Sequence, residues 1–423
     1  MNRNRDYELH CLLELIAAGI NKEAIPVWSR EPDWNTLYKL ADYHHVANTV
    51  YGMILGMDSK RLTKWKSSFE ERFRYCVVMH PRYREAEKEI LNAMERARIH
   101  CMELEETVIS GCYERKELHY PMPLGFLVEP GKADQVIQVM SRIGFELKGP
   151  GESPANAAKL TEQRFHKATG VSVVFYEKLT FTGKKIGKYF SLPPQPFQKK
   201  KGRSYNHVQD INDFYLYYIA LLAEKYARGT VEIRDMLDLW QYYLLCYERM
   251  EWKTIYKELK RLEIDQFGDL IVKLAAMWFG QLEELEDDSG LLPAMERYIA
   301  SKGTEAREEN EALLPLVKEV ADVYERDLKK EMRKKQLEMW FPERSYMEAI
   351  YPVLSKTGIL LPFCWMARLA GRQLRKVRYF FRRKWGAVRE AAKKVTAKLQ
   401  RIKASVKNIK ERFAKRKEDE NNP

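Results

Sequence analysis

Side chains that could hold a catalytic metal ion are the first residues to look for in this chain of 423 residues. Two carboxylates at alternate positions of a β-strand point to the same face and can clamp a pair of Mg²⁺ ions. The carboxylates that flank the apolar stretches at 126–128 and 171–176 are Glu117, Glu129 and Glu177, and none of them has an acidic partner two residues away. The segment at 119–125 carries prolines and a glycine but no acid. The sequence here predicts no metal-binding pair of carboxylates.

The histidines and cysteines offer no better metal site. His44 and His45 are adjacent, and neighbours on a helix point about 100° apart, so both cannot easily face one ion. We expect them to pack or to cap a helix. The acidic run at 283–289 is interpreted as a solvated loop, because its acids lack the spaced partners of a metal site. No C-x-x-C motif is present, so the cysteines are expected to be single buried thiols in a reducing compartment: Cys11, Cys76, Cys101, Cys112, Cys246 and Cys364.

The C-terminal tail carries the basicity of the chain. Residues 357–417 contain 20 lysines and arginines and only 2 acids, which gives this segment a net charge of +18, whereas the whole chain has +13. Apolar residues also recur at alternating steps of three and four, which predicts a long amphipathic helix. The stripe runs through Leu374, Val377, Phe381, Trp385, Val388, Ala392, Val395, Leu399, Ile402, Val406, Ile409 and Phe413.

Three interpretations of this tail are open. It is a helix packed on the body or on a partner helix, an interfacial helix on an anionic membrane surface, or a nucleic-acid-binding segment. Nucleic acid is less favoured, because phosphate contact does not need a continuous apolar stripe. Lysines and arginines near anionic lipid each contribute about 1 kcal/mol. The residues expected to contact an anionic surface are Arg375, Lys376, Arg378, Arg382, Arg383, Lys384 and Trp385.

The rest of the chain has the composition of a globular body. It is 45% apolar and 12% aromatic overall, which is enough to build a core. The N-terminal residues lack the apolar stretch of a signal peptide. No apolar run reaches the ~20 residues that span a bilayer, so no transmembrane segment is expected. We expect a cytoplasmic protein with peripheral membrane association through its tail.

The elements that would position a site change in character along the chain. Helical periodicity dominates as far as residue 97, with one amphipathic helix predicted at 83–97. Strands are predicted at 126–128, 145–147 and 171–176, with a helix at 134–143 between the first two. After a proline- and lysine-rich link at 192–203, helices are predicted again at 211–227, 230–248, 252–262, 268–284 and 304–338.

Four segments together resemble the uncharacterised bacterial nucleotidyltransferases of the polymerase-β-like superfamily. Residues 119–128, H-Y-P-M-P-L-G-F-L-V, are similar to the metal-binding strand of that family, approximately R-P-M-S-D-I-D-L-L-V. The other three are the D-W…L-A-D-Y-H-H-V segment at 33–46, the segment from Phe214 to Asp238, and the F-P…Y-P…L-L-P-F…W…R ending at 341–368. The resemblance covers roughly residues 7 to 382.

The departures from the family pattern gather where the resemblance places the chemistry. The two aspartates of the family strand correspond to Pro123 and Gly125, and a third carboxylate corresponds to Val174. The L-K-G that leads into the nucleotide site of the family corresponds to Leu104-Glu105-Glu106, and a pair of carboxylates there would repel a triphosphate. Arg234 and Asp238 of the family pattern are retained.

The resemblance implies an α+β fold: a small mixed sheet of nucleotidyltransferase type between an N-terminal and a C-terminal helical lobe, followed by the long basic helix. It implies two functions. One is a catalytically degenerate protein acting as a binding or scaffold module, with no cofactor. The alternative is an active enzyme that needs Mg²⁺ and an NTP and transfers a nucleotide to an unknown acceptor. The expected segments are 1–97 (helical lobe), 98–190 (α/β core), 208–345 (helical lobe), 346–370 (aromatic and proline-rich) and 371–423 (basic tail).

Overall fold

The structure is a computed structural model. It describes residues 3–148, 162–191, 198–280 and 291–301, with 333, 341, 344, 347 and 360–366. Residues 1–326 form one compact unit and residues 327–423 a second. The acidic run at 283–289, the helix expected at 304–338 (Arg333 apart) and the basic tail at 371–423 lie outside the described residues. The helices and strands named below belong to the first unit.

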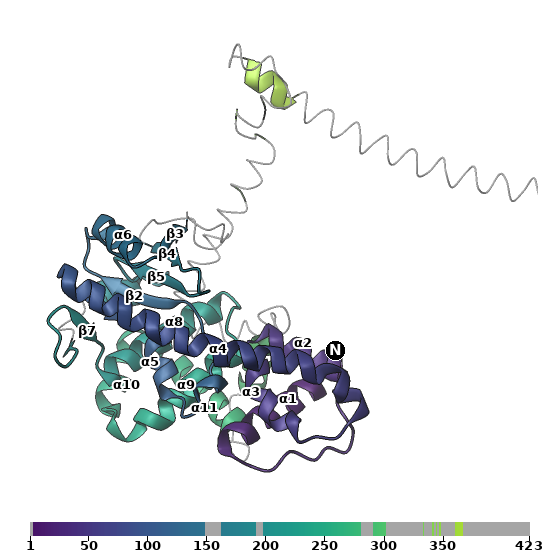
Figure 1. The fold of residues 1–423 in the computed structure, drawn as a ribbon. Helices are drawn as coiled ribbons and strands as arrows, with labels where there is room; N and C mark the ends of the chain where they lie inside the picture. Colours follow the sequence, from purple (N-terminus) through teal and green to yellow (C-terminus); the bar gives the residue numbers. More distant parts are fainter. Residues whose placement is uncertain are drawn as a thin grey trace, which may run out of the picture. The chain divides into compact units, whose positions relative to one another are not determined.

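Four helices open the fold: α1 (Arg3–Asn21), α2 (Trp34–Tyr43), α3 (Ala47–Leu55) and α4 (Lys60–Ala97). Side-chain caps set two of their starts, because Asp33 accepts from the N–H of Asn35 and Ser59 from that of Leu62. The predicted helix at 83–97 is therefore only the second half of α4, which continues through Pro81. Figure 1 shows α4 running from the N-terminal helices to the sheet.

The strands are β1 (Cys101–Glu103), β2 (Leu124–Val128), β3 (Glu146–Lys148), β4 (Glu162–His166), β5 (Ser172–Tyr176), β6 (Gln198–Lys199) and β7 (Asn206–Val208). They form one sheet in the order β3-β4-β5-β2-β1-β7-β6. The pairs β2–β5 and β1–β7 are parallel and the other pairs are antiparallel, so the sheet is mixed. Between the strands lie α5 (Glu105–Cys112), the 3-10 turn η1 (Lys116–Leu118), α6 (Ala133–Arg142) and α7 (Lys184–Ser191).

The chain then forms α8 (Ile211–Ala227), α9 (Ile233–Cys246), the 3-10 turn η2 (Tyr247–Arg249), α10 (Trp252–Arg261), α11 (Asp265–Phe279) and α12 (Leu291–Ala300). Gly229 follows the end of α8 with a φ of 66°, a left-handed conformation that glycine adopts without strain. In the part of the chain that the structure describes, no helix has both the length and the apolar character needed to cross a bilayer.

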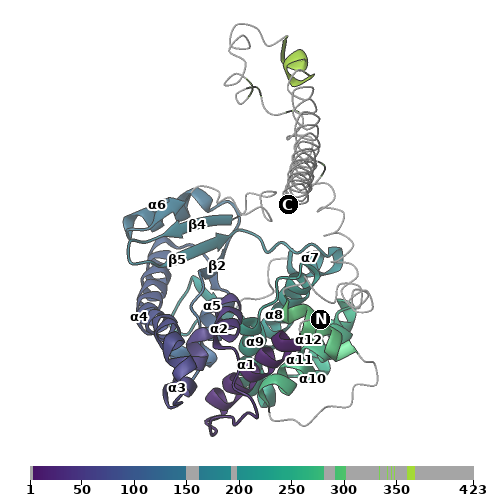
Figure 2. The ribbon, with the colours of Figure 1, turned by 90° about the vertical axis from the view of Figure 1, so that its right-hand side faces the viewer.

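Two hydrophobic cores lie on the two faces of the sheet. Successive strand residues point to opposite faces. Phe126 and Val128 accordingly pack with α4 and α6, whereas Leu127 packs with the helices on the other face. Figure 2 shows α4 and α6 on one side of the strands and α5, α8 and α9 on the other.

The two helical segments share one of these cores. Leu12 of α1, Phe279 of α11 and Ile299 of α12 belong to the same buried cluster. The side-chain amide of Asn21 also donates to the carbonyl of Phe279 at 2.9 Å. The α+β class with a small mixed sheet is confirmed, and residues of the N-terminal and the C-terminal helices share one core in addition to flanking the sheet. The expected segment boundaries stay predictions.

Candidate functional site

The parallel pairing of β2 with β5 brings two of the family-equivalent positions together. Gly125 lies directly opposite Val174 in the register. The N–H of Leu104, just before α5, donates to the carbonyl of Gly125 at 3.0 Å. Pro123 precedes the first residue of β2 and is exposed. Two of the positions that the resemblance assigns to family carboxylates, Gly125 and Val174, are thus neighbours beside the start of α5, and the third, Pro123, lies one residue before β2.

The face of the sheet at this point is closed by an apolar side chain. A Cβ atom at position 125 would lie 3.2 Å from the Cβ of Leu104 and 3.5 Å from its Cδ1. Leu104 is fully buried and Val174 is buried beside Gly125. An aspartate at position 125 would need Leu104 to move, and its carboxylate would enter an apolar environment.

The two carboxylates that follow Leu104 are both bound within the protein. The carboxylate of Glu105 accepts from the hydroxyl of Tyr217 on α8 at 2.7 Å. Glu106 is buried and accepts from the N–H of Met122 at 2.9 Å. Burial raises the pKa of Glu106 well above its ordinary value, although the charge of Arg234 and the hydrogen bond from Met122 lower it.

Glu106 belongs to a buried polar cluster, which we define as Glu106, Tyr113, His119, Arg234 and Asp238. Tyr113 donates to Asp238 Oδ1 at 2.7 Å, and Arg234 Nη1 donates to Asp238 Oδ2 at 2.7 Å. His119 Nε2 lies 3.7 Å from Glu106 Oε2 and 3.8 Å from Asp238 Oδ1. The cluster joins α5, the segment before β2, and α9.

Burial determines the charges within this cluster. It raises the pKa of Asp238 to about 6 although the adjacent Arg234 lowers it. It also lowers the pKa of His119 well below the ordinary value, with the charge of Arg234 as the second cause. His119 is therefore neutral at pH 7, and neither of its ring nitrogens has a hydrogen-bond partner among the described residues. Arg234 and Asp238 form the charged pair at the centre.

The cluster continues toward the surface through α9. Arg234 Nη2 also contacts Asp235 at 3.0 Å, and Lys225 contacts the same carboxylate at 2.7 Å. Glu232 caps the start of α9 and accepts from the ring of His45 at 2.7 Å. The retained Arg234 thus lies in a network that connects α8, α9 and the N-terminal helices.

Sequence reasoning found part of this cluster. The family resemblance identified Arg234 and Asp238 as positions that agree with the family pattern. It identified Glu106 as a position that differs from that pattern. Tyr113 and His119 were missed, because their partners are far away in the sequence and no local spacing marks them.

The three carboxylates that flank the apolar stretches at 126–128 and 171–176 have structural partners elsewhere. Glu117 pairs at 3.0 Å with an arginine two residues before it. Glu129 accepts from the N–H of His100 at 3.3 Å, and Glu177 accepts from the N–H groups at 131–133, which start α6. Within the described ranges, no group of three histidine, cysteine or acidic side chains is arranged to hold a metal ion.

The adjacent histidines at the end of α2 hold helices together. His44 is buried, its Nδ1 accepts from the N–H of Ile233, and its Nε2 lies 3.0 Å from the carbonyl of Ala300. His45 turns toward Glu232 with a φ of 54°. The expected packing or capping role is confirmed, since His44 also caps α2.

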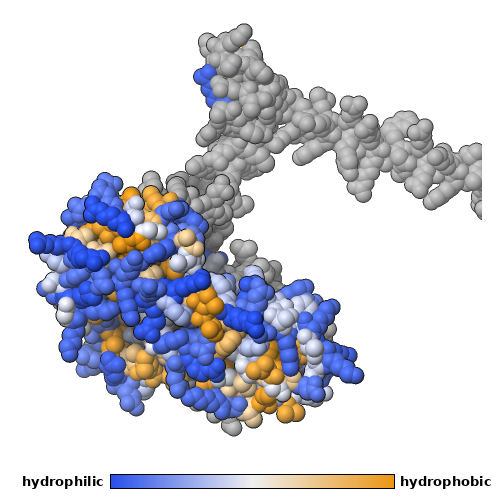
Figure 3. Space-filling model, in the orientation of Figure 1, coloured by the Kyte–Doolittle hydropathy of each residue, from blue (hydrophilic) through white to orange (hydrophobic). Residues whose placement is uncertain are grey.

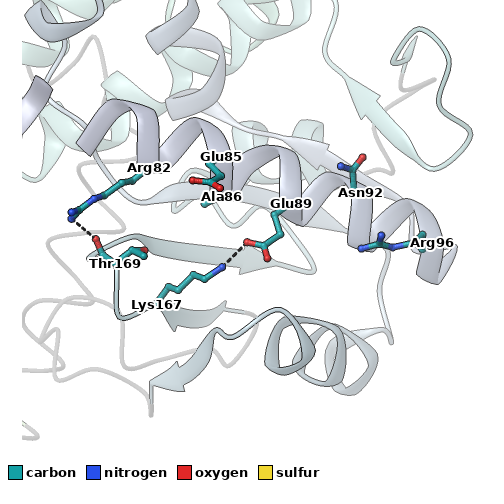
Figure 4. Close-up of a pocket in the computed structure, with 8 residues that line it drawn as sticks. All are labelled: Arg82, Glu85, Ala86, Glu89, Asn92, Arg96, Lys167 and Thr169. Atoms are coloured by element: carbon teal, nitrogen blue, oxygen red, sulfur yellow. Dashed lines mark hydrogen bonds and ion pairs between the residues drawn. The ribbon is translucent and has the colours of Figure 1, made fainter. Parts of the chain in front are cut away.

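A groove of about 500 Å³ lies on the far face of the sheet, between α4 and the turn after β4 (Figure 4). Two of its charged side chains pair with one another, and a third is bound to the backbone. Lys167 pairs with Glu89 at 2.6 Å, and Arg82 donates to the carbonyl of Thr169 at 2.9 Å. We therefore do not assign a ligand to it.

The class of protein follows from the sheet and the site. It is an α+β protein with a small mixed sheet, and the positions that the resemblance assigns to the site of the family lie where β2, β5 and the start of α5 adjoin. Residues 30–280 match the family described as uncharacterised nucleotidyltransferase, and the chain belongs to that family. No significant match was found among curated proteins or among solved structures.

Proposed function

We propose that this member of the family does not transfer nucleotides and acts as a binding or scaffold module. The observation that carries the proposal is the pairing of Gly125 with Val174 under the side chain of Leu104. Two-metal nucleotidyl transfer needs carboxylates that hold both ions against the phosphates. Glycine, valine and an exposed proline supply no side-chain ligand, and the carboxylates of Glu105 and Glu106 are bound by other groups of the protein.

Catalysis is tested with the full-length protein, α-labelled and γ-labelled forms of each NTP, and Mg²⁺ or Mn²⁺. We expect neither hydrolysis nor transfer of label to protein, RNA or small acceptors in a cell extract. Metal-dependent labelling that is lost in Glu106→Gln but kept in Glu85→Gln, an exposed position on α4, would instead support an active nucleotidyltransferase built on other carboxylates.

The binding partner that we propose is an anionic membrane surface, contacted by the tail at 371–423. The support is the sequence: a net charge of +18 over 357–417 together with a continuous apolar stripe. Paired parallel copies of this helix would place like charges opposite one another, which disfavours self-association. Aromatic residues such as Phe381 and Trp385 suit the boundary between headgroups and acyl chains.

The tail is tested by sedimentation with phosphatidylcholine vesicles that contain or lack phosphatidylserine. The full-length protein should sediment with the anionic vesicles only, and deletion from Leu369 onward should abolish this. Binding should weaken with salt, because the Debye length falls to ~3 Å at 1 M. Equal binding to neutral and anionic vesicles, or no binding to anionic vesicles, would contradict a lipid partner. It would favour a partner helix or nucleic acid as the partner of the tail.

A further inference from the structure

A second apolar surface lies on the folded body, where α9 ends and α10 begins. We call it the α9–α10 corner and define it as Leu244, Leu245, Tyr247, Trp252 and Tyr256. Leu244 and Leu245 are each 55% exposed, Tyr247 is 47% exposed and Tyr256 is 49% exposed. In Figure 3 apolar side chains on this face of the body form separate patches in a largely hydrophilic surface, one of them in the region of α10.

Two aromatic residues of the corner, Tyr247 and Trp252, form a preformed platform together with the neighbouring Tyr243 of α9. The ring centroids of Tyr243 and Tyr247 are 5.0 Å apart, and Trp252 lies 5.6 Å from the first and 5.1 Å from the second. The indole N–H of Trp252 donates to the carbonyl of Tyr247 at 3.1 Å. The rings hold one another in place, so the surface needs no rearrangement to bind.

Positive charge surrounds this platform. Arg249, Lys253, Lys257 and Lys260 are exposed and form no ion pair within the described part of the chain. The next cation, Arg261, is neutralised by Glu258 at 3.3 Å. Against these four cations stand Glu248 and Glu251, of which Glu251 accepts from the hydroxyl of Thr254. A platform of apolar and aromatic groups ringed by excess cations matches an anionic interface.

We infer that the α9–α10 corner is a second membrane contact, which docks the folded body on an anionic lipid bilayer. The inference rests on the proposed membrane binding of the tail and adds a surface that the tail does not supply. Tyrosine and tryptophan are favoured at the level of the lipid headgroups, where one end of the side chain is apolar and the other is wet. The cations meet the lipid phosphates and carboxylates.

Two other occupants fit less well. Single-stranded nucleic acid would stack on the rings, but it gives no burial to the two adjacent leucines, which cannot stack with bases. The basic tail of the same chain would meet Arg249, Lys253 and Lys257, so its docking here is opposed by like charges. Of these three occupants, anionic lipid is the one that satisfies both the leucines and the cations.

The test compares two double variants of the full-length protein. In one, Leu244→Glu and Leu245→Glu are combined. In the matched control, Val77→Glu and Val78→Glu are combined on α4, where the two valines are adjacent and are 47% and 49% exposed. The corner variant should bind vesicles containing phosphatidylserine about tenfold more weakly, whereas the control should bind like the wild type. Circular dichroism checks that both variants fold.

Hydrogen exchange gives a local readout on the same samples. Anionic vesicles should slow exchange in peptides covering residues 244–257 of the wild type and leave the peptides around Val77 unchanged. The inference would be overturned if the two double variants bound vesicles equally well or equally poorly and if vesicles also gave no protection at 244–257. Protection of 244–257 by single-stranded RNA but not by vesicles would overturn it in favour of nucleic acid.

A third variant, Arg382→Glu, Arg383→Glu and Lys384→Glu, separates this inference from the proposed role of the tail. If only the tail variant loses binding, the tail proposal stands and the corner inference fails. If only the corner variant loses binding, the proposed role of the tail fails.

Discussion

Placing an aspartate at position 125 tests directly whether the face of the sheet has room for a metal-binding side chain. The Cβ atom alone would meet Leu104 Cβ at 3.2 Å, which requires a shift of a few tenths of an ångström and should cost about 1 kcal/mol in Gly125→Ala. In Gly125→Asp the carboxylate also loses its hydration without a partner, and the total should reach about 3–5 kcal/mol. The matched control is Gly111→Asp, at an exposed glycine with no atom within 4 Å of an added Cβ.

The assay is urea unfolding of the three variants, followed by circular dichroism and tryptophan fluorescence. The destabilisation of Gly125→Asp relative to Gly125→Ala should shrink as the pH falls below about 4, because the carboxyl group then becomes protonated in the unfolded chain as well as in the folded one. Gly111→Asp should change the free energy of unfolding by less than about 1 kcal/mol. If Gly125→Asp were as stable as Gly125→Ala, or if added Mg²⁺ raised its unfolding midpoint, the account of a closed site would be refuted.

Two further predictions concern buried charges. Arg234→Met leaves Asp238 without its cation and should destabilise the protein by about 3–5 kcal/mol, whereas Lys22→Met, which breaks an exposed pair, should cost less than about 1 kcal/mol in the same urea titration. Burial, and then a hydrogen bond with Glu103, raises the pKa of Glu87 to about 7. A carboxyl group whose pKa is raised by folding stabilises the folded state at pH values below its ordinary pKa. This stabilisation is lost as the pH rises through the raised pKa of about 7. Glu87→Gln should therefore raise stability by about 2–3 kcal/mol at pH 8 and by little at pH 5, and equal effects at both pH values would exclude this explanation.

The local sequence pattern predicted those elements whose hydrophobic periodicity is visible within the element itself. The strands at 126–128 and 171–176 and the helices at 211–227 and 252–262 are observed with small changes at their ends, since alternation and helical spacing are read from neighbours. β4 was missed because Glu162–His166 is a mostly polar strand at the side of the sheet. β6 was missed because the link at 192–203 has the composition of a loop, and β7, Asn206–Val208, was missed because a strand of three residues is too short to show alternation.

Long-range packing was beyond such reasoning. Nothing local in α1 indicates that Leu12 shares a core with Phe279, because that contact depends on how the sheet turns the chain. The residues of the candidate site likewise fall into those that the sequence identified and those that only the tertiary fold brings together. The resemblance found Arg234 and Asp238, whereas His119 joins them only through the tertiary fold.

The buried polar cluster gives Arg234 and Asp238 a structural role that does not depend on catalysis. Removing either partner would leave a charge in a water-free site, which costs more than keeping the pair. Tyr113 and Asp235 add hydrogen bonds that fix its geometry. The pair therefore supports the junction of α5 with α9 independently of any catalysis.

The most direct test of the proposed closed site is Mn²⁺ binding, measured by electron paramagnetic resonance on the full-length protein with and without ATP. The account predicts that the signal of free Mn²⁺ is the same as in matched solutions without protein. A protein-dependent loss of this signal that saturates at one or two ions per chain and disappears in Glu105→Gln or Glu106→Gln would contradict it.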